Sequence, residues 1–160
     1  MAVTSTPHSF EQLLATLKKS YLRVNFVQAE TFYWSPKDKT VYFAPEKSDA
    51  QWSLVHELSH ALLDHTSYSS DFELLLLEVA AWEKAEDVAV KLGLKIEKDH
   101  IQDCLDTYRD WLHRRSECPT CQMRGLQVSP TTYECTNCFN KWHVSMARFC
   151  RPYRRQIATK

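Results

Sequence analysis

Apolar residues recur at helical spacing in four stretches of the chain, with polar residues at the positions between them. This pattern predicts helices over residues 10–21, 50–64 and 71–92, and from about residue 99 to the charged segment 113–117. Ser9 and Gln12 form a plausible capping box for the first helix, and Gly93 is a typical stop for the third. The chain is therefore expected to be largely helical.

Two shorter segments between the first two helices predict β-structure. Residues 22–34 are rich in β-branched and aromatic side chains, and residues 40–44 form a second strand candidate. The five residues between them, 35–39, have the composition of a turn. We therefore expect a hairpin or small sheet, and an α+β fold in which a mostly helical domain holds a short antiparallel sheet.

The second predicted helix contains the motif His56-Glu57-Leu58-Ser59-His60. Two histidines four residues apart project from one helical face, so both imidazoles can reach the same metal ion. Glu57 lies beside that ion, where its carboxylate can take a proton from a water molecule. This arrangement is typical of half of a zinc-hydrolase site.

A catalytic zinc needs a third protein ligand, and the helix predicted over residues 71–92 is the place to search for it. Glu78 lies on the apolar stripe of that helix, one turn from both Leu74 and Trp82. Burying a lone carboxylate there is costly unless a cation offsets the cost. We therefore predict that His56, His60 and Glu78 hold zinc. Glu83 is the alternative third ligand, because Glu83 with Asp87 also resembles a ligand and its support.

Other polar residues near the motif have less defined roles. His65 is expected to be a solvated residue at the end of the helix. Three tyrosines are candidate donors for an oxyanion, and the sequence does not rank them: Tyr33, Tyr42 and Tyr68.

The segment from His56 to His65, followed by Glu78-x-x-Ala81, resembles the ImmA/IrrE family of gluzincin-type metallopeptidases. The resemblance covers about residues 10–95. It implies a zincin-like fold of a few helices around a small sheet, a zinc-dependent peptidase site, and regulatory cleavage of a transcription repressor. His56, His60 and Glu78 would be the zinc ligands and Glu57 the general base. Family members commonly have a polar residue after the alanine, whereas this chain has Trp82.

The C-terminal part of the chain contains two Cys-x-x-Cys pairs, separated by thirteen residues. Strand-prone segments at 126–128 and 132–133 lie between them, so the pattern predicts a zinc ribbon with a fully coordinated, structural zinc. We expect two domains, a zinc metallopeptidase-like domain over residues 1–116 and a zinc ribbon with a basic tail over residues 117–160. Cys104 is interpreted as a core residue, and Cys150 as a free thiol or an occasional additional ligand. The four predicted ligands are Cys118, Cys121, Cys135 and Cys138.

The net charge of zero hides an uneven distribution. Residues 118–160 carry seven basic residues and one acidic residue, or +6, and residues 1–117 carry −6. Basic residues interleaved with aromatic ones can bind nucleic acid. The favoured interpretation is that the aromatic residues cover the small ribbon core, while the arginines dock on the acidic part or stay solvated. The residues concerned are Phe139, Trp142, Arg148, Phe149, Arg151, Tyr153, Arg154 and Arg155.

The sequence shows no export signal and no apolar run of membrane-spanning length, so we expect a soluble, cytoplasmic protein that needs no membrane. The main hypothesis is a zinc metalloendopeptidase that acts on a protein or peptide substrate. In it, the strand around residues 41–44 would offer an edge to an extended peptide.

Two alternatives remain open at this point. One is a nucleic-acid-binding regulator with a silent or partner-activated site. The other is a DNA-associated protease similar to repair proteases of the SprT type, which would take a later histidine, His100 or His113, as its third ligand.

Overall fold

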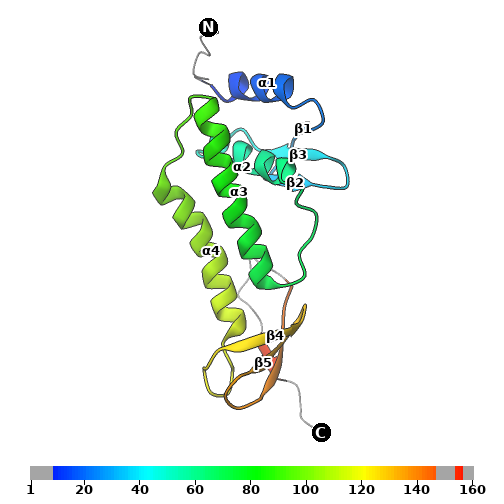
Figure 1. The fold of residues 1–160 in the computed structure, drawn as a ribbon, viewed down its shortest axis with the longest axis vertical. Helices are drawn as coiled ribbons and strands as arrows, with labels where there is room; N and C mark the ends of the chain where they lie inside the picture. Colours follow the sequence, from blue (N-terminus) through cyan, green and yellow to red (C-terminus); the bar gives the residue numbers. More distant parts are fainter. Residues whose placement is uncertain (1–8, 147–153, 157–160) are drawn as a thin grey trace. The chain divides into compact units, whose positions relative to one another are not determined.

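The computed structural model describes residues 9–146 and 154–156, which form an α+β fold of four helices and two small sheets (Figure 1). The helices are α1 (Phe10–Ser20), α2 (Ala50–Leu62), α3 (Asp71–Lys91) and α4 (Lys98–Ser116). The strands are β1 (Asn25–Gln28), β2 (Tyr33–Ser35), β3 (Thr40–Phe43), β4 (Gly125–Ser129), β5 (Thr132–Cys135), β6 (Lys141–Val144) and β7 (Arg154–Gln156).

The chain divides into two compact units. The first unit consists of residues 1–67 and 77–101, and the second of residues 68–76 and 102–160. This division differs from the boundary predicted between residues 116 and 117, because the beginning of α3 and most of α4 group with the cysteine-rich segment. The physical reason is a set of buried polar contacts in the second unit that involves Asp71 and Arg115.

The sheet of the first unit has the strand order β1-β3-β2. β2 and β3 form the predicted antiparallel hairpin, but β1 pairs with β3 in parallel. The segment 22–34 thus holds β1 and most of β2, and residues 29–32, of which Glu30 and Thr31 are exposed, carry the chain across to the other side of β3. The expectation that residues 41–44 form a free edge was wrong, since β3 is the central strand and β1 and β2 are the edges.

Helix α2 packs against this sheet and is the element that carries the histidine motif. Its fully buried residues Leu54, Val55 and Leu58 supply the apolar contact surface, and Val41 is the fully buried residue of β3. Asp49 precedes α2 but makes no capping hydrogen bond to the helix, because its carboxylate accepts from the Ser53 hydroxyl instead. The motif helix is therefore fixed mainly by packing.

The boundaries of the other helices follow local signals in the sequence. The Ser9–Gln12 capping box is present at the start of α1. α3 ends at Lys91, and Gly93 follows with a φ of 67°. Positive φ is accessible to glycine without steric cost, so the chain turns there toward α4.

The sheet of the second unit has the antiparallel order β4-β5-β6-β7. Its small core consists of Tyr133, Trp142 and Val144 together with Cys118 and Cys135. The Trp142 indole N–H donates to the Arg115 carbonyl (2.9 Å), which joins this core to the end of α4.

A buried ion pair anchors the same unit. Arg115 Nε donates to Asp71 Oδ2 (2.6 Å), and the Tyr133 hydroxyl donates to the same oxygen (2.6 Å). The guanidinium also donates to the carbonyls of Ser145 and Pro130. Arg115 and Asp71 are only 1% and 3% exposed. A buried pair is stable only when its remaining polar groups are satisfied, and here they are.

Among the described residues, no helix is both long enough and apolar enough to cross a membrane.

Candidate metal centres

The first unit brings His56, His60 and Glu78 together in one group that can hold a metal ion. The histidines lie one turn apart on α2, and Glu78 comes from α3. His56 Nε2 is 3.2 Å from both Glu78 Oε2 and His60 Nε2, and His60 Nε2 is 3.5 Å from Glu78 Oε1. The three side chains offer two nitrogens and one carboxylate from three converging directions.

The composition and burial of this group suit a divalent cation. Glu78 is only 6% exposed and His56 only 7% exposed. Burial favours a raised pKa for Glu78, but hydrogen bonds from His56 and His60 outweigh it and lower the pKa to about 2. For His60, burial acts to lower the pKa, and the Glu78 carboxylate more than offsets this and raises it. An ionised carboxylate this deeply buried needs positive charge beside it, and two imidazoles with one carboxylate form a donor set that zinc accepts.

Glu57 follows His56 on α2 and is half-buried. Burial raises the pKa of its carboxyl above the ordinary value, and the negative charge of Glu78 adds to the increase. His56, His60 and a backbone hydrogen bond from Trp34 act in the opposite direction. A carboxylate with a raised pKa beside a metal-binding group is suited to accept a proton and give it back.

His65 is a part of the site that sequence analysis missed. Its Nδ1 lies 2.8 Å from Nδ1 of His60, and its carbonyl accepts from the Trp34 indole (2.9 Å). The motif helix ends at Leu62, and Asp64 takes a φ of 52°, so the chain turns and places His65 beside His60. The expectation of a solvated helix-end residue was wrong because the helix was expected to continue to residue 64.

Trp82 supports the other histidine in a different way. Its indole stacks on the His56 imidazole, with ring centroids 4.1 Å apart and an interplanar angle of 24°. His56 Nδ1 is buried and has no hydrogen-bond partner among the residues that the structure describes. The two histidines are therefore held by different kinds of contact.

The alternative third ligands do not join this group. Glu83 is exposed on α3, as is Asp87. His100 lies 3.7 Å from the Asp49 carboxylate and packs edge-on against Trp82. His113 belongs to the second unit, where it contacts Arg124. Glu78 is thus the residue that the fold places beside both motif histidines.

Two of the candidate oxyanion donors, Tyr33 and Tyr42, stack on each other with ring centroids 4.3 Å apart, and the third, Tyr68, lies in the second unit.

The second unit contains the other metal-binding group, formed by Cys118, Cys121, Cys135 and Cys138. Two pairs of sulfurs lie 3.5–3.6 Å apart, too far for disulfides, and all four thiols are free. Residues Gln122 and Phe139, each directly after the second cysteine of a pair, share a positive φ of 63° and 58°. The two Cys-x-x-Cys segments thus form matching turns that point their sulfurs at one position.

The acidities of these thiols show that they interact strongly. Backbone and Asn137 hydrogen bonds lower the pKa of Cys121 to about 6. For Cys138, a backbone hydrogen bond from Asn140 acts to lower the pKa, but burial and the neighbouring cysteines raise it to about 12. Four adjacent thiols cannot all ionise without a cation, and a bound metal removes this conflict.

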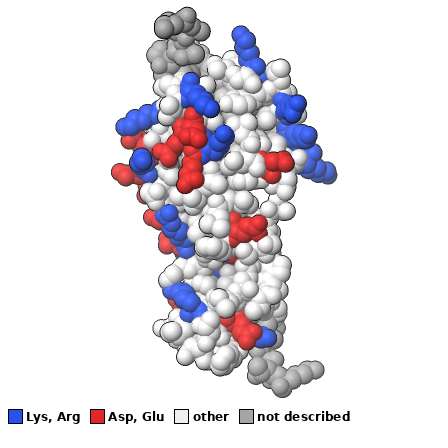
Figure 2. Space-filling model, viewed as in Figure 1, with Lys and Arg blue, Asp and Glu red and all other residues white. Residues whose placement is uncertain are grey.

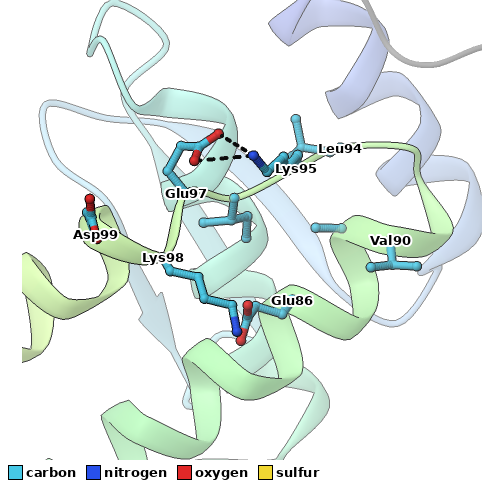
Figure 3. A pocket seen from close by; sticks show the side chains of 9 residues that line it. Glu86, Val90, Leu94, Lys95, Glu97, Lys98 and Asp99 are labelled. Carbon is cyan, nitrogen blue, oxygen red and sulfur yellow. Dashed lines mark hydrogen bonds and ion pairs between the residues drawn. The ribbon is translucent and has the colours of Figure 1, made fainter.

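A separate pocket of about 510 Å³ lies where α3 ends and α4 begins (Figure 3). Val90 and Leu94 line it together with charged residues, among them the paired Lys95 and Glu97 (3.1 Å). None of the metal-binding residues lines this pocket. We therefore place the candidate chemistry at the two metal groups.

The described surface does not carry a continuous basic stripe on the face shown in Figure 2, where Lys and Arg are interspersed with Asp and Glu. In the second unit, Lys141 pairs with Glu134 (3.2 Å) and Arg124 with Glu117 (3.8 Å). Part of the predicted basic and aromatic tail lies outside the described residues: Arg148, Phe149, Cys150, Arg151, Tyr153 and the side chains of Arg154 and Arg155.

No family model, curated protein or solved structure matches the chain. The geometry of the two groups is therefore the basis on which a function can be proposed.

Proposed function

We propose that the protein is a zinc-dependent metalloendopeptidase of the ImmA/IrrE type, with a structural zinc in its ribbon. The convergence of His56, His60 and Glu78, with Glu57 adjacent on the same helix, is the observation that carries this proposal. The pattern is that of a three-ligand metal site with a neighbouring general base, as found in metal-dependent hydrolases.

Each residue has a defined part in peptide hydrolysis. His56, His60 and Glu78 would hold the zinc, which when bound acts as a Lewis acid toward a water molecule and the scissile carbonyl. Glu57 takes a proton from the attacking water as the new C–O bond forms. It then gives this proton to the leaving amine as the C–N bond breaks. The raised pKa of Glu57 suits both steps.

The substrate is proposed to bind in an extended conformation beside β2. β2 is an edge strand, and a backbone hydrogen bond from its Trp34 reaches Glu57. An edge strand offers unpaired backbone groups to an extended peptide. This edge replaces the one expected at β3, and a transcription repressor remains the proposed class of protein substrate on the basis of the family resemblance.

Zinc content per chain tests the metal site. The parent protein should contain two zinc ions, and His56→Ala and Glu78→Ala should each contain one. Glu83→Ala is the matched control, because Glu83 is an exposed acid on the same helix, and it should retain two. One zinc per parent chain would contradict the proposed site.

Glu57→Gln tests the chemistry separately. This variant should retain both zinc ions and the fold but lose cleavage, because an amide cannot accept the proton. Cleavage at the parental rate would exclude Glu57 as the base.

A further inference from the structure

Trp82 stands at the position where the family resemblance leads one to expect a polar residue. It lies one turn after Glu78 on α3, and it is only 4% exposed. Its ring is nearly parallel to the His56 imidazole, with centroids 4.1 Å apart. The side chain that replaces a polar group is therefore in direct contact with a proposed zinc ligand.

A metal-ligating histidine usually donates its second ring N–H to an acceptor, which fixes the orientation of the ring. His60 has such a contact through His65, at 2.8 Å. His56 Nδ1, in contrast, is buried and has no hydrogen-bond partner among the described residues. A different interaction must therefore keep the His56 ring in place.

The stacked indole provides this constraint. Rotation of the imidazole about its Cβ–Cγ bond would move ring atoms into the space that Trp82 fills. In the observed orientation, His56 Nε2 lies 3.2 Å from Glu78 Oε2. Trp82 also packs edge-on against His100, with centroids 5.6 Å apart.

We propose that Trp82 is a positioning residue for the metal site, which holds His56 by aromatic stacking in place of a hydrogen bond to Nδ1. This inference rests on the proposed zinc site. It implies that the face of an aromatic ring, more than apolar bulk, is what the site requires at residue 82.

The affinity of the full-length protein for zinc at the site of His56, His60 and Glu78 tests this role. It is measured by competition with a chelator. Trp82→Leu keeps an apolar side chain but loses the aromatic face, and it should weaken binding about tenfold or more. Trp82→Phe keeps an aromatic face and should remain close to the parental affinity. If Trp82→Leu does not fold, Trp82→Met takes its place in the comparison with Trp82→Phe.

Trp52→Leu is the matched control. Trp52 also packs on His100, with centroids 4.7 Å apart, and it belongs to the same helix as His56. This variant should bind zinc at the site of His56, His60 and Glu78 with parental affinity. Cobalt substitution gives a second measurement, because the visible absorption of cobalt at this site reports the position of His56. The absorption should change in Trp82→Leu, where His56 is loosened, and should stay unchanged in Trp82→Phe.

Parental affinity in Trp82→Leu, or equal losses in Trp82→Phe and Trp82→Leu, would overturn the proposal. A parent that binds no second zinc ion would overturn it together with the proposed function. The affinities are measured without substrate, so a parent that binds two zinc ions but cleaves no protein would contradict the peptidase function alone.

Discussion

His60 and His65 face each other through their Nδ1 atoms, which lie 2.8 Å apart. His60 directs its Nε2 toward Glu78, at 3.5 Å, so this nitrogen is the one available to a metal. When Nε2 of a neutral imidazole binds a metal, the proton of the ring is on Nδ1. With a metal on Nε2, His60 Nδ1 would donate to His65 Nδ1, and this contact would fix the tautomer of His60.

His65→Ala should weaken zinc binding at the site of His56, His60 and Glu78 about tenfold, because His65 would no longer support the orientation and basicity of the His60 ring. Chelator competition measures this loss. His65→Gln retains a side-chain acceptor and should recover part of the affinity. Unchanged affinity in His65→Ala would show that the contact does not support the ligand.

The metal-free protein should lose the stabilising effect of Glu78 as the pH falls. The folded-state pKa of Glu78 is about 2, below the ordinary value of 4.5. The contribution is therefore present above pH 4.5 and is lost as the pH falls toward 2. The pKa of His60 is raised above 6.5. The stabilisation that protonated His60 contributes is therefore lost as the pH rises through this raised pKa.

Urea unfolding of the metal-free parent and of metal-free Glu78→Gln measures this effect. The difference between their free energies of unfolding should be largest between pH 4.5 and 6.5 and should decrease on both sides. A difference that does not vary with pH would contradict the ion-pair interpretation.

Gly125→Ala should destabilise the second unit by about 1–3 kcal/mol, through overpacking. A Cβ at this position would meet the Trp142 indole and would lie 2.8 Å from the Glu134 carbonyl oxygen. Thermal or urea unfolding of the zinc-loaded protein measures the loss. Trp142→Phe removes the indole atoms concerned, so the double variant should lose less than the sum of the two single losses.

Arg115→Ala should cost about 3–5 kcal/mol, because it leaves the Asp71 carboxylate buried without its partner. Arg114→Ala is the matched control, since Arg114 is the exposed neighbour on the same helix, and it should have little effect on stability. Equal stabilities of the two variants would show that the buried pair is not needed for folding.

Much of the fold could be predicted from local sequence. The helical spacing of Leu13 and Leu17, with the Ser9–Gln12 box, predicted α1 almost to its last residue. The turn composition of residues 35–39 predicted the hairpin between β2 and β3. The parallel pairing of β1 with β3 could not be predicted in this way, because it depends on where a short irregular segment takes the chain.

The candidate site could likewise be predicted only in part from local sequence. Helical periodicity placed His56 and His60 on one face, and the cost of a buried carboxylate indicated Glu78, so the sequence predicted the group that the fold assembles. The contacts of His65 and Trp82 were not predictable. The first depends on the backbone turn at Asp64, and the second on how α2 and α3 pack in three dimensions.

The contacts of Asp71 determine whether the four-cysteine segment can fold apart from the rest of the chain. The aspartate that accepts hydrogen bonds from both Arg115 and Tyr133 precedes Cys118 by many residues in the chain. A fragment that begins at residue 117 would carry the four cysteines but neither member of the ion pair, and the Tyr133 hydroxyl would lose its acceptor. The four-cysteine segment is therefore not an independent module, and moving it to another protein would require the first turn of α3 and the last turn of α4 to accompany it.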